Sequence, residues 1–339
     1  MRLKDVSIKD VAKAAGVSNT AVSLVMNKGK IRLSEKKRKA ILDAAENLGY
    51  SPNVSARRLV TGRTDTLGLV FPYNSEALSH YFLFELTRGI SRAAKLNQYD
   101  LLLDFMLSAE ADSFAMDSSR MDGIIVVLDR DEKSCQPGMP ANCNHPCIAV
   151  GGAFLKKTPD NFIDVDIESG SLAATLHLIE LGHKQIVFLA SVYSPCKQIG
   201  YEKAMAKAQM EPLSELIAGK GTREEQTNTT IQRLLKRDPL PTAFVTTDDT
   251  LAMLVIKALH RMGIDVPRDI SVVGFDDIEP SRLIEPALTT VRIPVQKMSD
   301  HVVSGLVAKI RNKKNKPVQT ILPTELVIRE SSARIDTGR

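Results

Sequence analysis

Apolar and polar positions near the start of the chain follow the period of short helices. Between Ile8 and Ala15 apolar residues recur every three or four positions, which predicts an amphipathic helix. Ser7 and Asp10 have the spacing of a capping box at its start, and Gly16 is suited to end it. We therefore predict a first helix that buries one apolar face.

Two further helices follow in the same region. Ser18 is a suitable N-cap for a helix over Asn19–Met26, and Ser34 is suited to cap a third helix that Gly49 ends. Two short helices joined by a turn that contains glycine form a helix-turn-helix, whose second helix is sized for the major groove of DNA. The same pattern also fits a small helical subdomain with no role in binding DNA.

The side chains early in the second helix would lie closest to the bases of a bound duplex. We predict that Asn19, Thr20 and Ala21 face base edges, and that Ser18 and Ser23 reach phosphates.

The segment after Tyr50 combines a short helix, ended by Gly62, with basic residues. Arg57 and Arg58 stand directly before Leu59. A lone short helix is marginal in water, so this one needs a partner in order to form. A leucine flanked by arginines suits the minor groove, where an apolar wedge opens a base step and the cations hold the backbone.

From residue 67 onward, short continuous apolar runs alternate with helical stretches. This alternation predicts parallel β-sheets covered by helices on both faces. The runs are Leu67–Phe71, Leu101–Leu103, Gly123–Val127, Cys147–Val150, Ile186–Leu189, Ala243–Thr247 and Ser271–Phe275.

Polar and aromatic residues stand where several of these runs end, and ligands of open α/β sheets bind outside the carboxyl ends of the strands. Carboxylates and a cation around an aromatic face can bind sugar hydroxyls through charge-assisted hydrogen bonds and stacking. Each single acid has an alternative interpretation as a helix N-cap or a hinge contact. The residues at these ends are Pro72, Tyr73, Phe82, Ser191, Tyr193, Lys197, Asp248, Asp249, Asp276 and Asp277.

The composition, 43% hydrophobic and 25% charged, is that of a globular protein. No apolar run approaches the roughly 18 residues that span a bilayer, and the charged N-terminus does not resemble a signal peptide, so we expect a cytoplasmic protein. Charge is unevenly distributed: residues 1–64 carry 14 Lys and Arg against 5 Asp and Glu, a net charge of +9, and the remainder carries 31 against 35, a net charge of −4. Such a basic segment indicates a polyanion partner, although a solvated basic face would have the same charge.

Three of the four cysteines lie close together with a histidine. If the chain were extended from Cys143, then Cys143, His145 and Cys147 would face one way and could bind zinc together with Cys135. The alternative is a loop that enters a buried strand with its thiols acting as small apolar groups. The spacing matches no familiar structural zinc site, so we expect no metal. The motifs of nucleotide-binding loops, nucleophile elbows and zinc proteases are absent, so we expect no enzymatic activity.

Five motifs occur in order along the first sixty-four residues: Ile8-Lys-Asp-Val-Ala-Lys-Ala-Ala-Gly-Val-Ser, Ala21-Val-Ser, Leu48-Gly-Tyr-Ser-Pro-Asn, Ala56-Arg-Arg-Leu and Thr61-Gly-Arg-Thr. These motifs resemble the lactose-repressor/galactose-repressor family, and the resemblance continues down nearly the whole chain. It implies an all-α helix-turn-helix headpiece (1–50), a hinge helix and linker (51–64), and an α/β two-lobed, periplasmic-binding-protein-like core with parallel sheets (65–339). It also implies crossings between the lobes near Phe162–Asp164, Arg292–Pro294 and Leu322–Pro323.

The resemblance further implies a homodimer whose paired hinge helices insert Leu59 into the minor groove of a near-palindromic operator, with Asn53, Ala56 and Arg57 also at the DNA. The C-terminal tail has no heptad leucines, so we expect no tetramer made through a coiled coil. Leu24, which we also place at the DNA, stands where the family often has arginine, so a guanine-reading contact is missing.

Aligned with the effector positions of the family, six of the residues at strand ends are predicted to bind a small molecule: Tyr73, Phe82, Tyr193, Lys197, Asp248 and Asp276. Two positions depart from the family pattern, which often has arginine in place of Lys197 and asparagine in place of Asp248. Lysine lacks the bidentate fork of arginine, and an added carboxylate repels anions, so we expect a neutral or amino-bearing sugar.

We therefore predict a repressor of sugar-utilisation genes. A sugar-like effector, with no other cofactor, would open or close the lobes and so form or melt the hinge helices. One alternative is a regulator of the same family that responds to a partner protein. Another is a solute-binding protein, against which the basic helix-turn-helix argues.

Overall fold

A computed structural model of the chain describes residues 6–26, 32–50, 62–71, 81–105, 120–128, 145–153, 158–191, 194–312 and 316–335. The chain divides into two compact units, residues 1–64 and residues 65–339. Across the described ranges, no helix is both long and apolar enough to cross a membrane.

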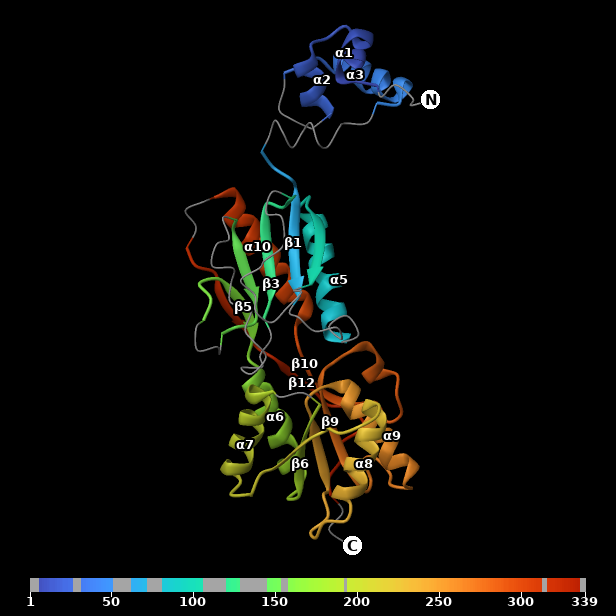
Figure 1. Cartoon of the computed structure of the whole chain (residues 1–339), viewed down its shortest axis with the longest axis vertical. Coiled ribbons are helices and arrows are strands. Elements are labelled where there is room, and N and C mark those ends of the chain that lie inside the picture. The colour runs from blue at the N-terminus through green and yellow to red at the C-terminus, as the bar shows by residue number, and fades with distance from the viewer. Residues whose placement is uncertain are drawn as a thin grey trace. The chain divides into compact units, whose positions relative to one another are not determined.

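The described part of the first unit contains three helices, α1 (Ile8–Ala15), α2 (Asn19–Met26) and α3 (Glu35–Leu48) (Figure 1). Their limits confirm the prediction from the sequence. Ser7 and Asp10 form the expected capping box, and the Ser34 hydroxyl accepts a hydrogen bond from a backbone N–H of the first turn of α3. Gly16 and Gly49 end α1 and α3 in the left-handed conformation, which a residue with a Cβ adopts only with strain.

A small core holds these three helices together. Each helix contributes one face to it, and Val11, Val22 and Ile41 are completely buried. A core of so few side chains stabilises the unit only slightly, so a loss at any of these positions is a large fraction of its stability.

The second unit contains two six-stranded sheets. The first has the order β11-β5-β4-β3-β1-β2, and all of its strand pairs are parallel. Its strands are β1 (Thr66–Phe71), β2 (Asp100–Phe105), β3 (Gly123–Val127), β4 (Cys147–Val150), β5 (Phe162–Val165) and β11 (Gln319–Leu322).

The second sheet has the order β12-β10-β9-β8-β6-β7 and is parallel except where β10 pairs with β12. Its strands are β6 (Ile186–Ala190), β7 (Leu213–Leu216), β8 (Ala243–Thr246), β9 (Ser271–Asp276), β10 (Thr289–Arg292) and β12 (Glu325–Val327).

Helices cover both faces of the second sheet (Figure 1). Along β6, Phe188 packs in the same core cluster as residues of α6 and α7, whereas Leu189 packs with residues of α8 and α9. This alternation is the two-residue period of a strand buried on both sides. On the first sheet, α10 packs against α5 and against β3, β4 and β5. The helices are α5 (Tyr81–Leu96), α6 (Ile167–Glu180), α7 (Pro195–Lys207), α8 (Arg223–Leu234), α9 (Asp249–Arg261) and α10 (Val295–Arg311).

The chain passes between the two sheets three times: after β5, after β10, and between β11 and β12. These are the crossings that the family resemblance implies. All seven apolar runs are strands, as predicted, whereas β5, β7, β10, β11 and β12 are strands that the apolar pattern did not reveal. They are only three or four residues long, and β7 and β12 contain acidic residues.

Candidate functional site

The start of α2 presents a polar, exposed face in the first unit. Ser18, Asn19 and Thr20 are exposed. The Ser18 hydroxyl accepts a hydrogen bond from the backbone N–H of Ala21 at 3.2 Å, so it caps the helix. The prediction that these three side chains contact DNA remains open, and their exposure is compatible with it.

Ala21 does not lie where we expected. It is only 6% exposed and packs in the core with Val22 and Val25, because these three positions share one face of the helix. Its methyl group is therefore not available to a base edge, and the prediction for Ala21 is corrected. Ser23 and Leu24 are half-buried and border the exposed face.

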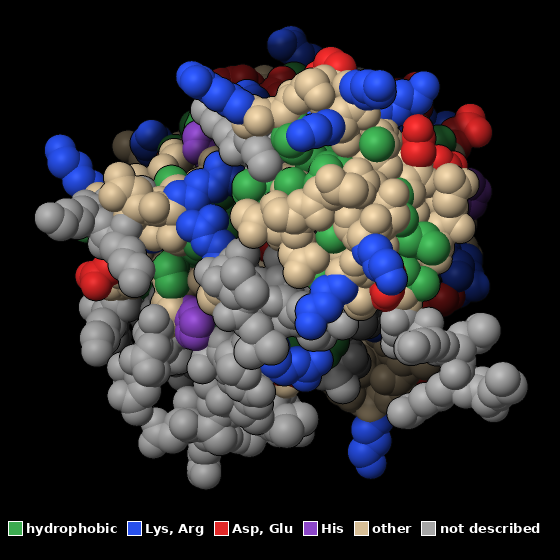
Figure 2. Space-filling view, turned by 90° about the horizontal axis from the view of Figure 1, so that it is seen from above, with side chains coloured by type: hydrophobic (Ala, Val, Ile, Leu, Met, Phe, Trp, Pro, Cys, Tyr) green, Lys and Arg blue, Asp and Glu red, His purple; other side chains and the backbone are tan. Residues whose placement is uncertain are grey.

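Lys and Arg side chains project around the face seen in Figure 2, where Asp and Glu are fewer. In the described part of the first unit, Lys9, Lys13, Lys36, Lys37 and Lys39 are all exposed. Such a surface favours phosphate contacts. The other predicted DNA contacts, Asn53, Ala56, Arg57 and Leu59, lie outside the described residues.

A second polar cluster lies at the carboxyl ends of the strands of the second sheet. Asp248 follows β8, Asp276 ends β9, and Lys197 comes from α7, which follows β6. The structure thus brings three of the six predicted effector residues together. All three are buried, at 9%, 3% and 8% exposure for Lys197, Asp248 and Asp276 respectively.

Lys197 links several parts of this cluster. Its ammonium group donates a hydrogen bond to the carbonyl oxygen of Thr247 and lies 3.7 Å from the Asp276 carboxylate. It also lies 3.9 Å from the ring centre of Phe275, within the range of a cation–π contact. The lysine therefore joins the ends of β8 and β9.

Asp248 caps helix α9 by accepting a hydrogen bond from the backbone N–H of Leu251 at 2.8 Å. Its second carboxylate oxygen accepts from the Ser191 hydroxyl and from the guanidinium of Arg223, both at 2.7 Å, and from Thr247 at 3.2 Å. Burial alone would raise the pKa of Asp248, but Arg223, Ser191 and the Leu251 N–H together hold that pKa below its ordinary value. Asp248 is therefore a charged group inside the sheet edge.

Asp249 has a different environment from its neighbour. It accepts hydrogen bonds from the Thr290 hydroxyl at 2.5 Å and from the backbone N–H of Ile278 at 2.9 Å. Burial, and next the negative charge of Asp276, raise the pKa of Asp249 well above its ordinary value. It therefore connects α9 to the segment after β9 and to β10.

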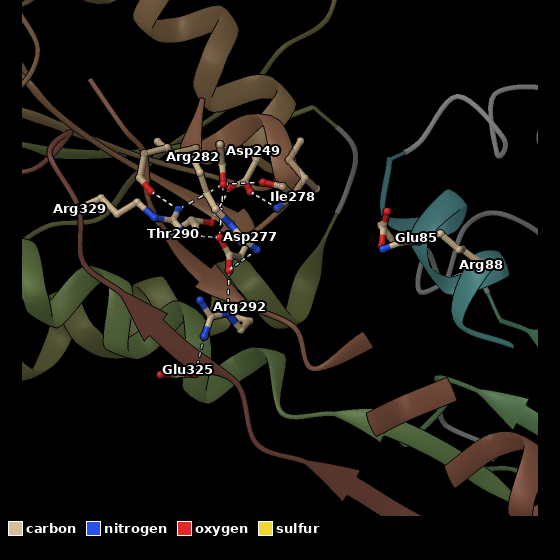
Figure 3. Close-up of polar contacts among 12 residues, drawn as sticks. Glu85, Arg88, Asp249, Asp277, Ile278, Arg282, Thr290, Arg292, Glu325 and Arg329 are labelled. Carbon is tan, nitrogen blue, oxygen red and sulfur yellow. Dashed lines mark hydrogen bonds and ion pairs between the residues drawn. The ribbon is translucent and has the colours of Figure 1, made fainter. Parts of the chain in front are cut away.

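Asp277 is the centre of an ion-pair network (Figure 3). Its carboxylate accepts hydrogen bonds from Arg292 at 2.7 Å and from Arg329, and Arg292 also pairs with Glu325 at 3.1 Å. Because Arg292 ends β10 and Glu325 begins β12, the network joins two of the crossings between the sheets. This outcome matches the hinge-contact alternative. Asp276 and Asp277 both have positive φ, 115° and 56°, a conformation that non-glycine residues rarely adopt.

The other predicted site residues are placed as follows. Phe82 lies in the first turn of α5, half-buried against the core, and the structure does not show it in contact with Lys197, Asp248 or Asp276. Tyr73 and Tyr193 lie outside the described residues, as do Cys135 and Cys143 of the candidate metal site. Cys147 is buried in β4, as the loop-and-strand alternative requires.

A separate cavity of about 400 Å³ lies near the C-terminal end of α9. Asp248 and Asp249 begin that same helix, so the cavity is not at the polar cluster. We favour the cluster as the ligand site, because it lies where the carboxyl ends of the strands meet. The cavity is lined by Ile256, His260, Ile264, Asp265, Val266, Glu285, Pro286 and Glu330.

Arg223 is a site residue that the sequence analysis missed. It is the first residue of α8, and its guanidinium pairs with Asp248, 25 positions further along the chain. The helix has a recognisable start, since Thr222 and Glu225 form a capping box. That signal could have revealed the start of α8 and, with it, a cation at the carboxyl end of β7.

A capped helix-turn-helix unit followed by two parallel α/β lobes, with a polar cluster at the strand ends of one lobe, defines a DNA-binding regulator with a small-molecule receptor. Residues 7–53 match the family described as "Bacterial regulatory proteins, lacI family", and residues 175–332 match the "Periplasmic binding protein-like domain".

Among curated proteins, the "Probable HTH-type transcriptional repressor ExuR" of Bacillus subtilis (strain 168) is 31% identical, covering 98% of this chain and 100% of that protein. Among solved structures, the lac repressor dimer bound to operator and the anti-inducer ONPF has a TM-score of 0.80 and 26% identity, covering 97% of this chain and 100% of that one. The transcriptional regulator CelR in complex with cellobiose has a TM-score of 0.69 and 27% identity, covering 96% of this chain and 100% of that one.

The chain therefore belongs to the lacI family of bacterial transcriptional regulators. Its fold is the one that the family resemblance implies, a helix-turn-helix headpiece with a two-lobed periplasmic-binding-like core.

Proposed function

We propose that this protein is a cytoplasmic, homodimeric repressor that binds a near-palindromic operator and is switched by a sugar-like small molecule. The observation that carries the proposal is the buried cluster of Lys197, Asp248 and Asp276, which the fold assembles at the carboxyl ends of the second sheet. Buried charges in a polar cluster at that edge are typical of a ligand site.

The relatives support the dimer, the binding of an operator and the small-molecule effector. The lac repressor structure contains a dimer, an operator and an anti-inducer, and the CelR structure contains the sugar cellobiose. A ligand at the strand ends would change the relative free energies of the arrangements of the two lobes, because three chain segments pass between the sheets. That change would alter the hinge helices we expect between residues 51 and 61.

We infer that the site binds its ligand without transforming it. Asp248 is held by Arg223 and Ser191, and Asp249 by Thr290 and Ile278. A carboxylate engaged in this way is poorly placed to take a proton from a substrate. We therefore assign no catalytic residue and no cofactor.

The test is selection of binding sites from random-sequence DNA duplexes by the purified full chain, with and without a panel of sugars and nucleosides. We expect one near-palindromic sequence to be enriched, and at least one compound to change its affinity. Asn19→Ala should weaken binding about tenfold, the effect of losing one good base contact. Asn47→Ala is the matched control, because Asn47 is also exposed in the first unit but lies on α3.

Weak, salt-sensitive binding with no enriched sequence would show that the basic segment is a nonspecific anchor. Enrichment of a site that no compound modulates would remove the small-molecule switch and leave the DNA-binding function standing.

A further inference from the structure

Arg223 stands beside the predicted effector residues and has spare hydrogen-bonding capacity. One terminal nitrogen of its guanidinium donates to Asp248 at 2.7 Å, whereas its buried Nε has no hydrogen-bond partner among the described residues. A buried N–H without a partner is costly, because it has lost its water without gaining a hydrogen bond in exchange, so it calls for an explanation. The side chain is 37% exposed, so it also reaches the surface of the cluster.

Asp248, in contrast, is already engaged by four donors. Three of them, the Ser191 hydroxyl, the Thr247 hydroxyl and Arg223, share one carboxylate oxygen. Each carboxylate oxygen offers about two acceptor positions, so a ligand hydroxyl could bond to this oxygen only by displacing one of the three. The other oxygen accepts the Leu251 N–H and keeps one position, but it is held at the start of α9 as the helix cap.

The position of Arg223 in its helix also indicates that this residue has a role in the site. It is the first residue of α8, where the helix dipole disfavours a cation. Two acidic residues, Glu224 and Glu225, follow in the first turn, but Glu225 is engaged in the capping box and Glu224 pairs with Lys257 and Arg261. The arginine is therefore held at this unfavourable place mainly by Asp248, which indicates a role beyond helix stability.

We propose that Arg223 contacts the effector and that Asp248 is a positioning residue that holds the guanidinium in place. Arg223 donates guanidinium N–H groups that Asp248 leaves free, on the exposed part of its side chain, to an acceptor oxygen of the ligand. This inference rests on the proposed function, and it adds Arg223 to the ligand contacts expected at this site.

The chemistry of the ligand follows from the charges around it. At this edge the two cations, Lys197 and Arg223, lie close to the two carboxylates Asp248 and Asp276, so the charge is balanced. The group offered by Arg223 is a donor, so the ligand must present an acceptor oxygen there, either a hydroxyl or carbonyl of a neutral sugar or the carboxylate of a sugar acid. A carboxylate would make the stronger, charge-assisted bond, and a neutral sugar would avoid repulsion from Asp248.

The experiment measures dissociation constants of the full-length protein for D-glucose, D-galactose, D-glucuronate, D-galacturonate and adenosine by isothermal titration calorimetry. For the compound that binds, Arg223→Gln should weaken affinity about tenfold to a hundredfold, the range for a lost hydrogen bond to a charged group. Arg233→Gln is the matched control: Arg233 lies on the same helix, 54% exposed, and pairs with Glu215. It should bind as the unsubstituted protein does.

Two further variants separate positioning from folding. Arg223→Lys keeps the positive charge beside Asp248 and the fold, but lacks the planar set of guanidinium N–H donors, so it should also bind the ligand weakly. Asp248→Asn should weaken binding in the protein that has Arg223, and should add little further loss in the Arg223→Gln background, because both changes remove one coupled contact.

Equal affinity of Arg223→Gln and the unsubstituted protein would overturn the proposal, as would additive losses in the double variant. Binding by none of the five compounds would overturn the proposed ligand class. The random-duplex selection needs no effector, so a selected operator in that case would show that the DNA-binding function stands on its own.

Discussion

Asp277→Ala should be among the most destabilising single changes in the second unit. The Asp277 side chain is 1% exposed and binds Arg329, which is 15% exposed, and Arg292, which is 41% exposed. Removing one partner of a buried ion pair costs about 3–5 kcal/mol, because the remaining charge stays buried. Here solvent screens Arg292, and Arg329 keeps a hydrogen bond to the carbonyl of Leu288 at 2.7 Å, so we expect the lower end, about 3 kcal/mol.

The assay is thermal and urea unfolding of the full chain across pH. A loss of about 3 kcal/mol lowers the Tm by roughly 6–12 °C, at about 2–4 °C per kcal/mol for a unit of this size. The control is Asp300→Ala, because Asp300 forms an exposed pair with Arg92, with side chains 48% and 51% exposed. That change should cost less than about 1 kcal/mol.

The pH dependence gives a second check on Asp277. Burial alone would raise its pKa, but the hydrogen bonds and charges of Arg329 and Arg292 hold the pKa below its ordinary value. A carboxyl group with a lowered pKa in the folded state stabilises the protein above its unfolded pKa, about 3.9, and that stability is lost as pH falls through the folded pKa. The difference in the free energy of unfolding between the unsubstituted protein and Asp277→Ala should therefore become smaller below about pH 4. The reasoning would be refuted if this difference in unfolding free energy were under about 1 kcal/mol at neutral pH, or if it did not become smaller in acid.

Three further changes test other parts of the structure. Asp249→Asn should raise the urea midpoint of unfolding at pH 8. Because the pKa of Asp249 is raised in the folded state, its stabilising contribution is lost as pH rises through that pKa. The amide of asparagine can still form hydrogen bonds with Thr290 and Ile278. A lower midpoint would contradict this. Gly274→Ala should cost about 1–3 kcal/mol by the same assay, because its Cβ would lie 2.2 Å from an Asp249 oxygen. Val22→Ala should cost the first unit about 2 kcal/mol and reduce operator affinity without changing effector affinity; a change in both would show that the units are not independent.

Much of the fold could be predicted from the sequence because its signals are local. Each of the seven apolar runs is bounded on at least one side by a polar or glycine residue, and the three described helices of the first unit carry their own caps at Ser7, Ser18 and Ser34. The strands that were missed lack such a signal. In β7, Leu213 and Leu216 flank a serine and a glutamate, and the segment is a strand because it pairs with β6.

The candidate site was predictable only in part. The rule that ligands bind at the carboxyl ends of strands gave ten residues, and the family resemblance reduced them to six. Of these six, the structure brings together Lys197, Asp248 and Asp276. The geometry of a helix-turn-helix could not exclude Ala21 from the DNA surface, because the burial of one helix face depends on how α1 and α3 pack against it. The strand-end rule could not find Arg223, since neither β7 nor α8 had been identified.

The four acids at the ends of β8 and β9 show why the remaining roles need the structure. As a sequence they are two identical Asp-Asp pairs, and either member of each could be a cap, a hinge contact or a ligand contact. Their roles are decided by partners far along the chain: Arg223 for Asp248, Thr290 for Asp249, Lys197 for Asp276 and Arg329 for Asp277. Each partner fixes the charge and the spare hydrogen-bonding capacity of its acid. One oxygen of Asp248 already accepts from Arg223, Ser191 and Thr247, so this acid orients the neighbouring cation, which is why we place an effector contact on Arg223.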